Sequence, residues 1–206
     1  IKTATPSPTT PILPVHQIKK INLSYCKNLT PLSLKLFLSM DSSMMTITHL
    51  DLRGVKSGST QKYITDIVCL CSDTLTVLKV GFGLDAIKAP PSRKPWNMPT
   101  AQIGLSDRSL CKIVDSCRLL TTLVIHGCHQ LRGTDLLQVS PPHSNLTTLD
   151  TSGCSALHMK GLLNILNMMP KVRNVNCSYT FITATTTSMI SANGRYGLYK
   201  LAEKHL

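Results

Sequence analysis

A pattern of three apolar residues, spaced as Leu-x-x-Leu-x-Leu, recurs along this chain and limits the folds open to it. It is clearest between Gly104 and Cys128, where Leu120, Leu123 and Ile125 follow the pattern, the last two on one face of a short strand. The preceding segment has helical spacing, and Ser106 and Asp107 are available to cap its start. Its apolar positions are Leu105, Leu110, Ile113, Val114 and Cys117. One helix and one strand therefore form a unit.

The unit occurs six times, and the first apolar residues of the six strand patterns are Ile18, Ile47, Leu75, Leu120, Leu146 and Val172. The intervals between them are 29, 28, 45, 26 and 26 residues, so one interval contains an insertion. A single unit cannot bury its apolar face alone, and neighbouring units must stack. The spacing predicts an α/β solenoid, a horseshoe of about six repeats with parallel strands on the concave face and helices on the convex face.

The fourth and fifth repeats read LTTLVIHGCHQL and LTTLDTSGCSAL, with Cys128 and Cys154 at matching positions. These two repeat sequences resemble the cysteine-containing class of leucine-rich repeats, best known from F-box proteins. Small mitochondrial leucine-rich-repeat accessory subunits also look similar. The resemblance implies the horseshoe fold and a role in protein binding.

The repeats suggest three regions. Residues 1–15 carry Pro6, Pro8, Pro11 and Pro14, which predict an extended Pro/Thr-rich arm. Residues 16–182 are the expected solenoid, with an insertion at about 84–102, and residues 183–206 are expected to form a C-terminal cap with helix-like text near its end.

The eight cysteines predict buried thiols rather than a metal site or disulfides. Cys26 shares the slot of Cys128 and Cys154, and a residue repeated once per turn packs in the interior. Cys69 and Cys71 lack a second pair at zinc-ligand spacing, so we expect no metal and no cofactor. No disulfide-type cap is visible in the sequence, which favours an intracellular, reducing compartment.

The Asn-x-Ser/Thr triplets at Asn22, Asn28, Asn145 and Asn176 match the N-glycosylation signal, but they are best explained as coincidence.

The net charge of +12 raises the expectation of an acidic or anionic partner. Most of the excess falls on expected helices, loops and the insertion, since the expected concave rows are close to neutral. Nonspecific contact of the basic loops with RNA or anionic lipid is therefore possible, whereas a basic concave stripe is not indicated. No run approaches the roughly 18 apolar residues that a transmembrane helix needs.

The sequence predicts no enzyme, because no phosphate loop, nucleophile elbow or metal-binding His/Glu pair accompanies its histidines and aspartates. Two sets of partner-binding residues are expected. If binding uses the concave side, the candidates are His49, Asp51, Arg53, Lys79, His126 and Asp150. If it uses the insertion, they are Arg93, Lys94 and Trp96, with Trp96 either an interface anchor or a lid on the solenoid.

Two functions are expected from the resemblance. The first is a non-catalytic scaffold, an accessory subunit of a mitochondrial assembly such as ATP synthase, a respiratory complex or the mitochondrial ribosome. The basic charge, the free cysteines and the first residue, Ile1 rather than Met, agree with a processed matrix protein. The alternative is the substrate-recognition part of an F-box-type ubiquitin-ligase receptor or a related cell-cycle regulator, in the cytoplasm or nucleus, with an F-box domain upstream of these residues.

Overall fold

In the computed structural model, seven parallel strands form one sheet in chain order, the arrangement expected of a solenoid. The structure describes residues 18–26, 28–39, 45–55, 61–81, 105–138, 145–180 and 197–198. The strands are β1 (Ile18–Asn22), β2 (Met45–Asp51), β3 (Val77–Gly81), β4 (Thr122–His126), β5 (Thr148–Asp150), β6 (Asn174–Asn176) and β7 (Gly197–Leu198). The helices are α1 (Pro31–Ser39), α2 (Gln61–Cys69), α4 (Asp107–Ser116) and α5 (Met159–Met168), with a 3-10 helix η3 (Asp135–Gln138).

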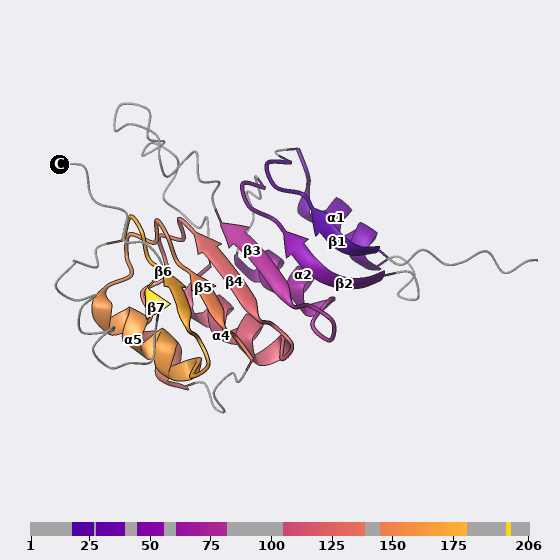
Figure 1. The fold of residues 1–206 in the computed structure, drawn as a ribbon. Helices are drawn as coiled ribbons and strands as arrows, with labels where there is room; N and C mark the ends of the chain where they lie inside the picture. Colours follow the sequence, from indigo (N-terminus) through magenta and orange to yellow (C-terminus); the bar gives the residue numbers. More distant parts are fainter. Residues whose placement is uncertain are drawn as a thin grey trace, which may run out of the picture.

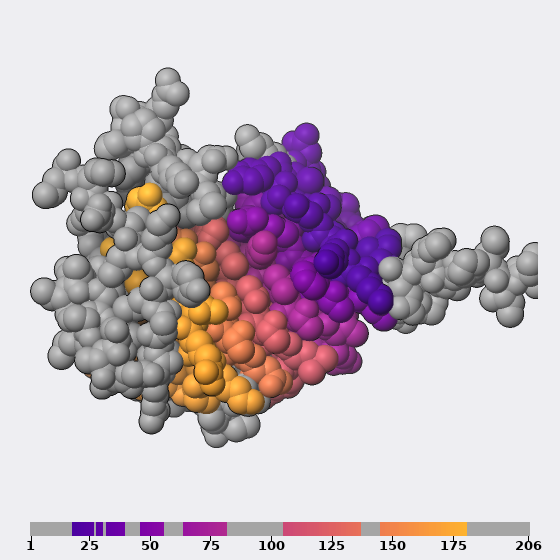
Figure 2. Space-filling model, viewed as in Figure 1, coloured from indigo at the N-terminus to yellow at the C-terminus, as the bar shows by residue number. Residues whose placement is uncertain are grey.

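The strands lie side by side with helices α2 and α4 behind the sheet (Figure 1), and successive turns form adjacent bands on its face (Figure 2). The register aligns the second apolar residue of every pattern with that of the next turn. The column formed in this way runs through Ile21, Leu50, Leu78, Leu123, Leu149 and Val175. All six are buried, so the apolar pattern forms a continuous core, and the predicted fold class is confirmed.

A ladder of threonines joins the strand starts of successive turns. Thr76 Oγ1 donates a hydrogen bond to the Thr48 carbonyl at 2.9 Å, and Thr121 Oγ1 donates to the Thr76 carbonyl at 3.1 Å. Thr48 and Thr147 make the equivalent bonds to Lys19 and Thr121. Each hydroxyl satisfies a carbonyl of the turn before it, which fixes the register between repeats.

The turns after β1, β2, β4, β5 and β6 each contain a residue with a left-handed backbone. Gly54, Gly127 and Gly153 have φ values of 68°, 61° and 74°. Tyr25 and Tyr179 occupy the same slot in the first and sixth turns, with φ values of 64° and 58°. Glycine adopts this conformation without steric cost, whereas a tyrosine is strained there.

The cysteine slot is buried in the middle of the solenoid but not at its beginning. Cys128 and Cys154 are fully buried, and the Cys154 thiol donates to the Ile125 carbonyl at 3.3 Å. Cys26 is exposed, so the prediction that all three thiols pack in the interior was wrong for Cys26. The reason is position, because the described residues include no turn before the first one to cover it.

These differences predict selective alkylation of the native protein. None of the eight cysteines forms a disulfide. Burial raises the pKa of the Cys117 thiol to about 12, so this thiol is both inaccessible and protonated at neutral pH. At pH 8 we expect iodoacetamide to modify Cys26 at least ~100-fold faster than Cys117. Peptide mass spectrometry of a time course measures both rates. After unfolding in guanidinium the two rates should converge, and equal rates in the native protein would contradict the burial of Cys117.

Two parts of the fold differ from the sequence-based expectation. Within the described residues of the fourth repeat, which end at 138 and resume at 145, the convex side has the short 3-10 helix η3 and no α-helix. The region expected to form the C-terminal cap contains the strand β7, which extends the sheet beyond β6. The sequence near β7 had suggested a helix. The arm at 1–15 and the insertion at 84–102 lie outside the described residues.

The loop at residues 132–135, which follows β4, is hydrogen-bonded by side chains of α4 and α5. Ser106 caps α4, accepting a hydrogen bond from the Ser109 N–H at 3.4 Å. The buried Asp107 carboxylate instead crosses to the next turn and accepts four backbone N–H groups. These donors belong to Arg132, Gly133, Thr134 and Asp135, at 2.8 to 3.2 Å. On the other side, Asn164 of α5 donates to the Gly133 carbonyl at 2.8 Å.

Candidate functional site

The candidate site is the row of polar side chains where the strands end on the concave face of the sheet. In four turns an Asp or Asn at the strand end accepts a hydrogen bond from the backbone N–H two residues later. The pairs are Asn22 with Ser24, Asp51 with Arg53, Asp150 with Ser152, and Asn176 with Ser178. This local bond ends each strand in the same way. The Ser24 and Ser178 hydroxyls donate to the same Asn22 and Asn176 oxygens at 2.7 and 2.8 Å, which explains why these asparagines begin Asn-x-Ser triplets.

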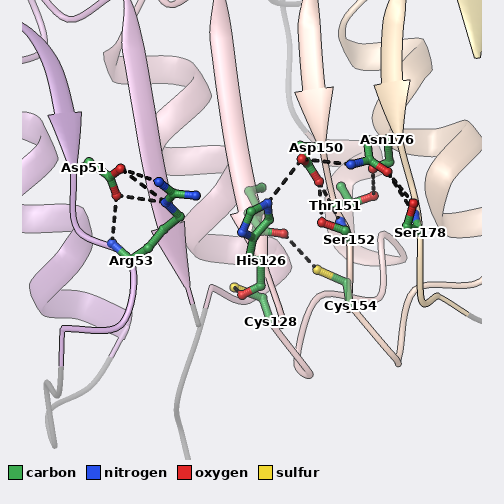
Figure 3. Close-up of polar contacts among 11 residues, drawn as sticks. Asp51, Arg53, His126, Cys128, Asp150, Thr151, Ser152, Cys154, Asn176 and Ser178 are labelled. Atoms are coloured by element: carbon green, nitrogen blue, oxygen red, sulfur yellow. Dashed lines mark hydrogen bonds and ion pairs between the residues drawn. The ribbon is translucent and has the colours of Figure 1, made fainter. Parts of the chain in front are cut away.

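At one end of the row, Asp51 and Arg53 form a bidentate ion pair (Figure 3). The Arg53 Nη2 atom lies 2.6 Å from Asp51 Oδ2, and Nε lies 3.0 Å from Oδ1. Burial acts to raise the Asp51 pKa, but the hydrogen bonds and charge of Arg53 outweigh it, so this pKa is below its ordinary value. Lys79 on the next strand adds a further lowering charge. Asp51 is itself buried, although a solvent-facing position was predicted.

Further along the row, Asp150 joins three neighbouring turns (Figure 3). Its Oδ1 accepts the Ser152 N–H at 2.9 Å and the Ser152 hydroxyl at 2.6 Å, and its Oδ2 accepts Asn176 Nδ2 at 3.0 Å. His126 Nε2 lies 3.2 Å from the same Oδ2. Asp150 is half-buried, and its bonds hold the ends of β4, β5 and β6 in a fixed arrangement.

His126 is 2% exposed, so the structure corrects its expected position on the binding surface. The ring stands where other turns have Ser24, Ser152 and Ser178, and the last two of these serines are buried as well. Its distance to Asp150 is that of an ion pair, but its alignment is not that of a hydrogen bond. Both ring nitrogens therefore lack a hydrogen-bond partner within the described residues.

Asp150 should make the stability of the protein depend on pH in the acid range. Burial acts to raise its pKa, but His126 and the two Ser152 hydrogen bonds lower it below the ordinary 3.8. A lowered pKa contributes stability that is present above pH 3.8 and is lost as the pH falls through the folded-state pKa. We expect Asp150→Asn to flatten this acid loss, as measured by urea unfolding between pH 5 and about 2. An unchanged acid slope in the variant would contradict the assignment.

Beside Asp150 the concave face is hollowed by a depression of about 310 Å³ over β4, β5 and β6. Its lining combines hydroxyl, amide, carboxylate and aliphatic groups, from Val124, Thr148, Leu149, Asp150, Asn174, Val175 and Asn176. Sequence reasoning identified only Asp150 of this set as a binding residue. The missed signal was the recurrence of Asn or Asp at successive strand ends, which places Asn176 beside Asp150.

The structure brings only part of the predicted site together. His126 and Asp150 are in contact, Asp51 and Arg53 form the ion pair, and His49 and Lys79 are half-buried on the central strands. Arg93, Lys94 and Trp96 lie outside the described residues. No group of three His, Cys, Asp or Glu side chains in the described ranges could hold a metal ion. No described helix is both long and apolar enough to cross a membrane.

Comparison with known proteins gives similarity at the level of the fold. No family model matches the sequence, and no curated protein matches it. Among solved structures, the crystal structure of the Rad7 and Elc1 complex in yeast contains a similar chain, with a TM-score of 0.55 and 13% sequence identity. The match covers 84% of this chain and 38% of that chain. This likeness supports the leucine-rich-repeat type of solenoid.

Proposed function

We propose that this protein is a non-catalytic recognition scaffold that works as a subunit of a larger protein complex. The observation that carries the proposal is the concave row, where Asp150, Ser152 and Asn176 hold one another in place beside an open hollow. Side chains fixed before binding lose little conformational entropy when a partner arrives. The similar chain was solved in the complex of Rad7 and Elc1, which supports protein partners for this chain.

Within this proposal the assembly belongs to one of two classes. A mitochondrial assembly, such as ATP synthase, a respiratory complex or the mitochondrial ribosome, is supported by the net charge of +12 and by eight cysteines that form no disulfide. An F-box-type ubiquitin-ligase receptor is supported by the cysteine-containing repeat sequences of turns four and five. Because unrelated functions share this fold, the partner must decide between them.

Native size fractionation of the endogenous protein, with mass spectrometry of co-migrating proteins, tests the proposal. Co-migration in constant ratio with an organellar complex assigns the first class, and co-migration with ubiquitin-ligase components assigns the second. If all of the protein migrates at the size of a free monomer, both assignments are contradicted.

A matched pair of variants tests whether the concave face makes the contact. Asn174→Arg places a long charged side chain in the hollow, where Asn174 is half-buried. Asn167→Arg makes the same change at an exposed position of α5. We expect Asn174→Arg to weaken complex formation at least ~10-fold and Asn167→Arg to leave it unchanged. If both variants co-migrate like the wild-type protein, the concave face is not the contact.

A further inference from the structure

The first turn of the solenoid, formed by β1 and α1, lies at one end of the described sheet (Figure 1). Its residues occupy the same repeat slots as later turns but are not covered in the same way. Ile18, which pairs with Met45 across a register shift, is 42% exposed, whereas Ile47 and Leu120 at the matching position of the sequence pattern are 3% and 0% exposed. Phe37 is 38% exposed, whereas Ile113 in its slot is fully buried. The first turn therefore presents core-type residues to solvent.

The outer flank of α1 is apolar where the flanks of the other helices are charged or polar. Leu36 is 58% exposed, and its slot holds Asp66, Lys112 and Asn164 in the later helices. Leu32 is 66% exposed, and its slot holds Lys62, Arg108 and Lys160. Lys112 and Asp66 form a 3.1 Å ion pair between neighbouring helices, the solution that suits a solvated flank. Two leucines one helical turn apart are instead typical of a surface that a partner covers.

The backbone of β1 offers the hydrogen-bonding groups that later turns use for pairing. In those turns an N–H at the strand start donates to the preceding turn, as from Thr76 to Thr48 at 2.8 Å. A carbonyl at the strand end accepts from the preceding turn, as Asp51 does from Leu23 at 2.9 Å. By the same geometry, Lys19 N–H and the Asn22 carbonyl lie along the outer edge of β1. Such an edge can take up a further strand.

The charge around this edge identifies the chemistry of the partner. Residues 18–39 contain Lys19, Lys20, Lys27 and Lys35 and no aspartate or glutamate. Lys19, Lys20 and Lys35 are exposed. A second copy of this chain would set lysines against lysines across the new strand pair, which is unfavourable. An acidic segment would pair its carboxylates with them instead.

We propose that the first turn is a docking surface for an acidic segment of a partner protein. The segment adds a strand to β1 and packs apolar side chains against α1. The surface, called here the N-terminal face, consists of Ile18, Lys19, Lys20, Leu32, Leu36 and Phe37. It is separate from the concave contact proposed above, and each interface can fail without the other.

Selection of peptides displayed on phage, with the full chain immobilised, tests this proposal. Random peptides of about 15 residues are long enough for one strand or about four helical turns. We expect the enriched peptides to combine aspartate or glutamate with spaced apolar residues. Leu36→Lys should weaken their binding at least ~10-fold, and so should the pair Lys19→Glu and Lys20→Glu. Circular dichroism melting confirms that these exposed substitutions leave the protein folded.

The matched control is Leu163→Lys, the same change at a leucine of α5 that is 41% exposed. It should leave peptide binding unchanged, and so should Asn174→Arg in the concave hollow. The proposal is overturned if no peptide is enriched, if the enriched peptides are not acidic, or if Leu163→Lys weakens binding as much as Leu36→Lys. Self-association of the wild-type protein in sedimentation, abolished by Leu36→Lys, would also overturn it, because the occupant would then be a second copy.

Discussion

Replacement of Asp107 by asparagine is expected to lower the free energy of unfolding by about 3 kcal/mol or more. One carboxylate oxygen accepts the N–H groups of Arg132 and Gly133, and the other accepts those of Thr134 and Asp135. A carboxylate can serve both pairs, whereas a carboxamide has only one accepting oxygen. In either orientation its NH₂ group meets two N–H donors, and each unsatisfied buried donor costs about 1–3 kcal/mol.

Guanidinium unfolding followed by circular dichroism measures this loss. The control is Asp115→Asn at the other end of α4, where the side chain is 45% exposed and 3.6 Å from Arg118. An exposed ion pair contributes little, so we expect a change within about 0.5 kcal/mol. Equal effects of the two substitutions would show that the bonds to the 132–135 loop do not stabilise the fold.

The second large effect is expected from Gly161→Ala in α5. A Cβ atom at this position would lie 1.8 Å from the Arg132 carbonyl oxygen and 2.8 Å from its carbonyl carbon. Both atoms belong to the backbone, so the helix or the loop must move. We expect a loss of about 3 kcal/mol or more, although alanine is intrinsically favoured over glycine in a helix by about 1 kcal/mol.

The sign of the change makes this a sharp test, because helix propensity and packing predict opposite outcomes. Asn167→Ala in the same helix is the control, since Asn167 is exposed. It should change the free energy of unfolding by no more than about 0.5 kcal/mol. Greater stability of Gly161→Ala than of the wild-type protein would mean that α5 does not pack on the 132–135 loop as described.

The structure on the convex side of the fourth turn could not be predicted from the spacing within one repeat. The strand and cysteine of this turn follow the pattern, yet the helix among its described residues is the 3-10 segment η3. Asp107 was assigned to a helix cap because acidic residues favour that position. Its carboxylate instead binds a loop 25 to 28 residues later in the chain. Spacing within one repeat cannot predict a bond between two repeats.

The concave row shows the same limit. Alternation along the strands predicted correctly that Leu123 and Ile125 face the core, and Asp150 was recognised as a polar strand-end residue. His126 was expected on the binding surface because its place in the repeat pattern puts it on the concave side. It is buried instead, as is Ser152 in the same slot of the next turn, because strands flank β4 on both sides. The hollow beside Asp150 depends on side chains from three strands, so no single repeat specifies it.

The sequence by itself determined the solenoid, its parallel strands and the inward-facing column, because a repeat with one buried face can only stack upon its neighbours. Only the tertiary structure decided which members of each slot are covered. Phe37 and Ile113 occupy one slot, and Cys26 and Cys128 another, yet the first of each pair is exposed and the second is buried. The physical reason is that exposure depends on the adjacent turns, whereas the repeat pattern depends on the turn alone.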